Sequence, residues 1–96
     1  MAEAKTCYVV EAKYAPDATT RRSPFRAEHL ERVGKLIEEG ALLIAGAMDD
    51  MSISLLVFDL KLEDSVAETI ERDVYWREGV WIDYSIRKLN RVMPPN

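Results

Sequence analysis

His29, the single histidine of the chain, occupies an unusual place for a polar residue. It lies in the stretch FRAEHLERVGKLIEEG, residues 25–40, where apolar side chains recur at helical spacing. At about 100° per residue from Phe25, His29 falls at about 40° and Arg26 at about 100°, inside an apolar arc from about 20° to 140°. The charged residues on the opposite, solvent-facing arc are Glu28, Glu31, Arg32, Lys35, Glu38 and Glu39. The pattern predicts that His29 and Arg26 turn inward.

Asp73 is the carboxylate best placed to act with this histidine. On a predicted helix over residues 63–73, with Glu63 at zero, Asp73 falls at about 280°, beside an apolar stripe. An acid at the C-terminal end of a helix opposes the helix dipole, so helix stability alone does not explain its position. A partly buried His–Asp pair performs acid–base chemistry, because the carboxylate fixes the imidazole tautomer and raises its basicity. The other ring nitrogen is then free to take a proton.

Two arginines near His29 indicate an anionic substrate. Arg26 lies one helical turn before His29, and Arg22 directly precedes Ser23, the expected N-cap of the helix. Guanidinium groups pair with carboxylates in a fixed fork, so both side chains could hold an anion beside the imidazole.

Each of these residues also has an ordinary structural explanation. A lone histidine on an apolar helix face is more often a satisfied core or rim residue than a catalyst, and it could also serve as a helix–helix clasp. An arginine on such a face often runs its stem along the core and keeps its head in water. Tyr75 and Trp76 either line a pocket or pack, whereas Trp81 is expected to pack. Cys7 is most simply a small hydrophobe in a strand.

Composition narrows the range of functions. The chain has 96 residues, 48% of them hydrophobic, and a net charge of −4, which fits one domain over residues 1–96 and argues against a nucleic-acid partner. The apolar runs are too short to cross a bilayer, and the N-terminus lacks a signal-peptide pattern, so we expect a cytoplasmic protein with no membrane partner. The sequence shows neither a histidine and cysteine cluster for a metal nor a glycine-rich phosphate loop, so we expect no metal and no cofactor.

The remaining patterns predict the elements that must position these residues. Strands are predicted at 6–14, 41–48, 51–60 and 80–89, and helices at about 24–39 and 63–73. Residues 15–24 are expected to form a loop, Gly40 to end the first helix, and the tail 90–96 to leave the sheet.

This order is that of a ferredoxin-like α+β fold, a β-α-β-β-α-β chain with two helices on one face of a four-stranded antiparallel sheet. The topology brings the start of the first helix and the end of the second to the same end of the sheet. His29 and Asp73 are therefore expected to meet. The other face of the sheet is left uncovered, and a second copy of the chain is its simplest cover, so we expect a homodimer.

Several segments together resemble the YciI-like (YCII-related) family of small dimeric α+β proteins. The segments are RSPFRAEHL, EEGALLIAGAM, SLLVFDL followed by EDSVAETIERD, and DVYWREGVW, and the resemblance spans about residues 6–89. Its most specific elements are Arg22 and Arg26 ahead of His29, and the pattern D-x-Y-x-x-x-G-V at residues 73–80.

The resemblance implies a dimeric α+β barrel in which a His29–Asp73 dyad lines a pocket, with Ser54 and Gly46 also at the site. Few members of the family have an assigned reaction, and dehydrochlorination of a hydroxylated aromatic is one known activity. Two positions where the family usually has proline carry Ala47 and Val74 here.

The leading hypothesis is a small-molecule enzyme of the lyase or isomerase type, in which His29 and Asp73 act as a general acid–base dyad without a cofactor. The predicted residues for binding an anionic or aromatic substrate are Arg22, Arg26, Ser54, Gly46 and Tyr75, with Arg26 and Ser54 expected to hold an oxyanion or carboxylate. The alternative is a non-catalytic ligand-binding or accessory module that keeps the pocket. Saturable binding without turnover would distinguish it.

Overall fold

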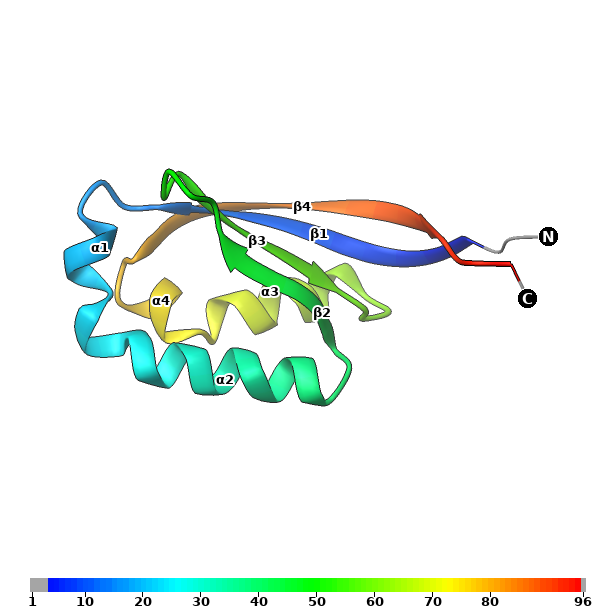
Figure 1. The fold of residues 1–96 in the computed structure, drawn as a ribbon, viewed down its shortest axis with the longest axis horizontal. Helices are drawn as coiled ribbons and strands as arrows, with labels where there is room; N and C mark the ends of the chain where they lie inside the picture. The colour runs from blue at the N-terminus through cyan, green and yellow to red at the C-terminus, as the bar shows by residue number, and fades with distance from the viewer. Residues whose placement is uncertain (1–3, 96) are drawn as a thin grey trace.

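The computed structural model describes residues 4–95 as two layers, with the helices covering one face of a single sheet (Figure 1). The elements, in chain order, are β1 (Ala4–Tyr14), α1 (Ala18–Arg21), the 3₁₀ helix η1 (Ser23–Phe25), α2 (Arg26–Glu38), β2 (Leu42–Ala47), β3 (Ile53–Phe58), α3 (Glu63–Glu71), α4 (Val74–Arg77) and β4 (Trp81–Val92). The helices of the described chain are all too short or too polar to cross a membrane.

The sheet has the strand order β2-β3-β1-β4, and each neighbouring pair is antiparallel. The two central strands, β1 and β3, are thus the first and third in sequence, as two right-handed split crossover units require. The prediction of a ferredoxin-like α+β fold is confirmed.

The core lies between the sheet and the helices, because strand side chains alternate between the two faces. In β3, Ser54, Leu56 and Phe58 are buried against the helices, while the residues between them are only partly buried. The helices contribute Val66 and Ile70, which are 0% and 1% exposed. This alternation leaves the far face of the sheet without a covering layer (Figure 1).

The prediction of a loop over residues 15–24 is wrong in detail, because this segment contains the helical turn α1 and most of η1. Ser23 starts η1 and makes no capping hydrogen bond, so its predicted role as N-cap is also wrong; Phe25 holds the cap position of α2. Asp17 stabilises the inserted turn instead, because its carboxylate pairs with Arg21 one turn later. The predicted left-handed stop at Gly40 is confirmed by its φ of 82°.

The second helix ends earlier than predicted. The helix α3 stops at Glu71, and a separate helical turn, α4, begins after Asp73, in the segment between the second predicted helix and the last predicted strand. Asp73 therefore lies at the N-terminus of α4 and not at the C-terminus of α3. A negative charge is favourable at a helix N-terminus.

The last strand departs from a simple alternation. Lys13 pairs with Asp83 but the next residue, Tyr14, pairs with Trp81, so Ile82 is an extra residue in β4. Because the bulge changes which side chains of the strand face inward, Trp81 is 1% exposed, in agreement with its expected packing, whereas Ile82 is 47% exposed. The strand also continues to Val92, so the prediction that the tail leaves the sheet at residue 90 is wrong.

Candidate active site

His29 and Asp73 meet as the topology predicts. His29 lies in the first turns of α2, and Asp73 is the N-cap of α4. The imidazole Nδ1 is 2.8 Å from Asp73 Oδ1, and the two residues are 7% and 2% exposed. This contact joins the two helical segments at one end of the sheet.

The carboxylate of Asp73 is held at both oxygens. Its Oδ1 also accepts a hydrogen bond from the backbone N–H of Tyr75, at 2.9 Å, which is the cap of α4. Its Oδ2 accepts a hydrogen bond from Arg32 Nη1 at 3.3 Å, and Nη2 of the same guanidinium donates to the carbonyl of Thr69 at 2.9 Å. A carboxylate that accepts on both sides requires a donor at His29 Nδ1, which leaves the Nε2 lone pair of the imidazole for a ligand.

Arg32 is a residue that the sequence interpretation missed. Its helical angle of about 340° placed it on the charged arc and it was read as solvent-facing. That angle lies at the edge of the arc, one turn after His29, and the guanidinium group reaches Asp73, with Nη1 3.3 Å from Oδ2. A cation three residues after an inward histidine was the available signal.

Two aromatic rings fix the orientation of the imidazole. The Tyr75 ring stacks on it, with centroids 3.7 Å apart and planes 7° apart. The Trp81 ring is nearly perpendicular to both, with centroids 5.3 Å from His29 and 5.6 Å from Tyr75. Since these two distances are nearly equal, Trp81 lies beside the stack and not at its end. Trp76, the other open case, contacts Tyr84 instead of the imidazole.

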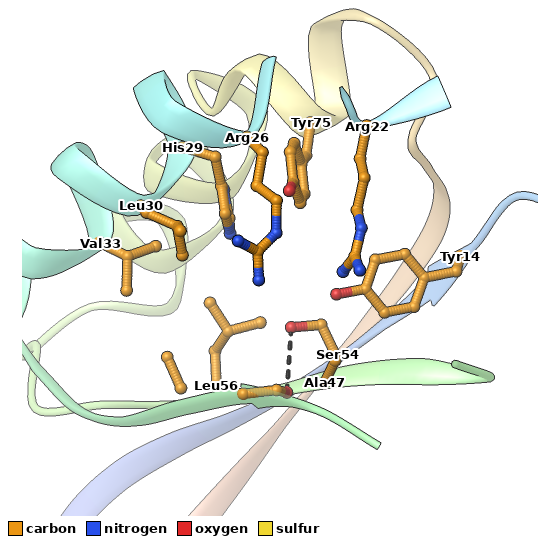
Figure 2. A pocket seen from close by; sticks show the side chains of 12 residues that line it. Tyr14, Arg22, Arg26, His29, Leu30, Val33, Ala47, Ser54, Leu56 and Tyr75 are labelled. Carbon is orange, nitrogen blue, oxygen red and sulfur yellow. Dashed lines mark hydrogen bonds between the residues drawn. The ribbon is translucent and has the colours of Figure 1, made fainter. Parts of the chain in front are cut away.

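His29 forms part of the wall of a pocket between α2 and the sheet, with a volume of about 190 Å³. Figure 2 shows His29, Arg26 and Arg22 reaching from the helical layer toward Ser54 and Tyr14 on the sheet. The complete lining is Tyr14, Arg22, Arg26, His29, Leu30, Val33, Ala45, Gly46, Ala47, Ser54, Leu56 and Tyr75. All the residues predicted to bind substrate are therefore at this pocket, and the lining contains no acidic side chain.

The two pocket arginines have no carboxylate partner within residues 4–95. The nearest polar contact of Arg22 is a long one, from Nη1 to the Met51 sulfur at 3.9 Å. Five of the six other arginines of the described chain, all except Arg91, are paired with acids: Arg21 with Asp17, Arg32 with Asp73, Arg72 with Glu68, Arg77 with Glu28 and Arg87 with Glu11. In a chain with a net charge of −4, this pocket concentrates unbalanced positive charge.

The hydroxyl groups of the pocket differ in their environments. Burial raises the pKa of the Tyr75 phenol, while the positive charges of Arg22 and Arg26 act in the opposite direction. Ser54 is 3% exposed, and its hydroxyl donates to the carbonyl of Gly46 at 3.2 Å. Gly46 thus joins the pocket through its backbone, and the space around its α-carbon is open.

Tyr14, which lines the pocket, is another site residue that the sequence interpretation missed. It was read as an ordinary residue of the first strand, and the bulge opposite it shifts its register against β4 by one residue. Acidic, histidine and cysteine side chains form no group of three that could hold a metal ion within the described part of the chain.

Comparisons with known proteins agree with this architecture. The YCII-related domain matches residues 6–90. The solved structure of 5-chloro-2-hydroxyhydroquinone dehydrochlorinase (TftG) from Burkholderia phenoliruptrix AC1100, in complex with 2,5-dihydroxybenzoquinone, is similar, with a TM-score of 0.72 and 20% sequence identity. The alignment covers 84% of this chain and 90% of that one. A search of curated protein sequences gave no match.

Proposed function

The chain belongs to the YCII-related domain family, and from that premise we propose that it is a small-molecule enzyme of the lyase or isomerase type that moves a proton with His29. The observation that carries the proposal is the 2.8 Å contact between His29 and Asp73 at a pocket that also contains two unpaired arginines. The structural neighbour is named a dehydrochlorinase, and removing the elements of HCl is a lyase reaction in which a base takes a proton as chloride leaves.

The proposed mechanism uses only side chains of the pocket. Arg22 and Arg26 hold an anionic oxygen of the substrate and stabilise negative charge that develops on it. His29 takes a proton at Nε2 and becomes an imidazolium, which Asp73 stabilises through Nδ1–H. In an isomerisation the same nitrogen returns the proton to another atom; in an elimination the proton passes to solvent after the leaving group departs.

The dimensions of the pocket suit a substrate with one ring. A cavity of about 150 Å³ is large enough to hold benzene. At about 190 Å³, this pocket has room for a single six-membered ring with small substituents. Leu30, Val33 and Leu56 supply apolar surface for the ring, while the arginines meet its anionic group.

Exchange of carbon-bound hydrogen tests this function without knowledge of the product. The protein is incubated in deuterated water with single-ring anions that have an acidic C–H, and with 5-chloro-2-hydroxyhydroquinone, while deuterium uptake and chloride release are followed. We expect catalysed exchange or release with at least one compound and a loss of about 100-fold or more in His29→Gln, as for removal of a general base. Arg91→Gln, at an exposed residue of β4 outside the pocket, is the matched control.

The non-catalytic alternative makes a different prediction in the same experiment. A ligand-binding or accessory module would bind ring anions saturably, and neither exchange nor chloride release would exceed the rate without protein. That result across the whole panel would overturn the enzymatic proposal.

We also propose that two copies of the chain pair through the open face of the sheet. Apolar side chains alternate onto this face from neighbouring strands; they include Val9, Ile44, Ile53, Leu55, Val57 and Leu89. Ile44 is 58% exposed, and the Glu11–Arg87 ion pair lies on the same face. Several exposed apolar side chains gathered on one sheet face are typical of an interface. A face-to-face pair of such sheets would form the α+β barrel expected for this family.

A cytoplasmic location is part of the same proposal. The only cysteine, Cys7, is buried as a free thiol, and one cysteine allows no disulfide within the chain. Cytoplasmic proteins keep their thiols reduced, which fits this residue. Immunodetection in fractionated cells would test the location.

A further inference from the structure

The pocket contains two buried hydroxyl groups, on Tyr14 and Ser54, that face the arginines from the sheet side (Figure 2). Resting on the function proposed above, we infer that these hydroxyls recognise a substrate that carries a hydroxyl donor beside its anionic group. Tyr14 donates to the anionic oxygen, and Ser54 accepts from the substrate hydroxyl.

Tyr14 is placed for this role by the backbone. In the β1–β3 register, Ala12 is opposite Ser54, and Tyr14 follows two residues later on the same face. The side chain is 6% exposed, yet its hydroxyl points into the pocket next to the Arg22 guanidinium (Figure 2). Among the residues drawn there, the phenol makes no hydrogen bond, so its proton is available to a ligand.

Ser54 is available as a hydrogen-bond acceptor, whereas Tyr14 is available as a donor. A serine hydroxyl has one proton and two lone pairs, and the proton of Ser54 is directed at the carbonyl of Gly46. While that bond is present, Ser54 can offer a ligand only a lone pair. In that state its partner in the pocket is an O–H or N–H group, whereas the sequence interpretation assigned Ser54 to hold an oxyanion or carboxylate.

The ligand therefore has to satisfy two different requirements at one end. An anionic oxygen faces the two guanidinium groups and the Tyr14 hydroxyl, which are all donors. A neighbouring substituent faces Ser54, which accepts. A plain carboxylate meets the first requirement and leaves Ser54 unmatched, whereas a hydroxylated ring acid or a partly ionised ring diol meets both.

Binding of substituted benzoates tests the inference directly. Calorimetric titration at fixed salt compares 2- and 3-hydroxybenzoate with 2- and 3-fluorobenzoate, because fluorine is close to a hydroxyl in size and carries no proton. We expect at least one hydroxybenzoate to bind about tenfold more tightly than its fluorinated counterpart, the size of one good hydrogen bond.

Variants then identify which side chain forms the hydrogen bond with the ligand hydroxyl. Ser54→Ala should remove the tenfold preference while leaving the affinity for the fluorobenzoates unchanged. Tyr14→Phe should weaken all four anions by a similar factor, because it removes a donor to the shared carboxylate. Tyr8→Phe, at a buried tyrosine of β1 outside the pocket, is the matched control, and melting temperatures verify that each variant folds.

The possible failures are distinguishable. If the hydroxy and fluoro compounds bind equally to the wild type, or if the preference survives Ser54→Ala, this inference is overturned while the anion-binding pocket of the proposed function stands. If none of the four anions binds, the proposed anion site fails, and the inference fails with it.

Discussion

The imidazole of His29 lies flat against the phenol ring of Tyr75, with centroids 3.7 Å apart. Together with the bond from Nδ1 to Asp73, this stack fixes both the tilt of the ring and the direction of its free nitrogen. His29 therefore has two separable contributions, one to packing and one to proton transfer, and different substitutions remove them separately.

Replacement of His29 by phenylalanine keeps a ring on Tyr75 and removes both nitrogens. We expect His29→Phe to abolish turnover, and to cost about 1 to 3 kcal/mol of stability because Asp73 loses a buried partner. His29→Ala should be less stable than His29→Phe, since it also loses the stack. Urea unfolding and turnover are measured on the same preparations, and wild-type turnover in His29→Phe would contradict the assignment.

Loss of Arg32 should disturb the carboxylate without touching the pocket. Arg32→Gln removes the ion pair to Asp73 and the bond to the Thr69 carbonyl, so we expect a loss of about 1 to 2 kcal/mol in the free energy of unfolding. Lys35→Gln, which breaks an exposed pair with Glu31 on the same helix, should change it by less than about 0.5 kcal/mol. Equal effects of the two substitutions would show that Arg32 contributes no more than a surface charge.

The unpaired arginines should control affinity and its dependence on salt. Each of Arg22→Gln and Arg26→Gln is expected to raise the dissociation constant for a ring anion about tenfold or more, because a charge-assisted hydrogen bond is lost. The slope of affinity against salt should fall in both variants. Titrations from low to high salt measure this effect, with Arg91→Gln as control. Unchanged affinity in both variants would place the anion elsewhere.

Tyr84 should ionise at higher pH than an ordinary tyrosine. Its hydroxyl donates to Glu71, and this hydrogen bond raises the pKa of Tyr84 to about 12. The folded-state pKa is above the unfolded value of about 10, so the contribution to stability is full below pH 10 and is lost as the pH rises toward 12. Ultraviolet titration should show this tyrosine ionising late in the wild type and earlier in Glu71→Gln. Identical titration curves for the two proteins would contradict the role of Glu71.

The open sheet face gives a prediction about assembly. Ile44→Lys should convert the proposed dimer into a monomer, because it places a charge among the apolar side chains of the proposed interface. Ile37→Lys changes a similarly exposed isoleucine, 47% against 58%, on the helical layer and should leave the dimer intact. Light scattering after size-exclusion chromatography measures the mass. A monomeric wild type would overturn the proposal.

The sequence predicted the parts of the site that follow from regular periodicity. Helical spacing turned His29 inward, and the order of elements brought it to Asp73, because crossover handedness leaves few arrangements. It did not predict that Asp73 caps a separate helix, because the break between α3 and α4 depends on a local hydrogen bond to the backbone of Tyr75. It missed Arg32 and Tyr14, whose contacts depend on a long flexible side chain and on a bulge, and neither leaves a periodic signal.

The additional residue in β4, Ile82, divides the sheet into two regions that can change independently. From the chain termini to the pair Lys13–Asp83, β1 and β4 keep one uninterrupted register. Beyond the bulge the register is shifted by one residue, so that Tyr14 pairs with Trp81. Lengthening or shortening β4 by one residue at this point would turn Trp81, which packs beside the stacked rings of His29 and Tyr75, and leave the rest of the sheet in register.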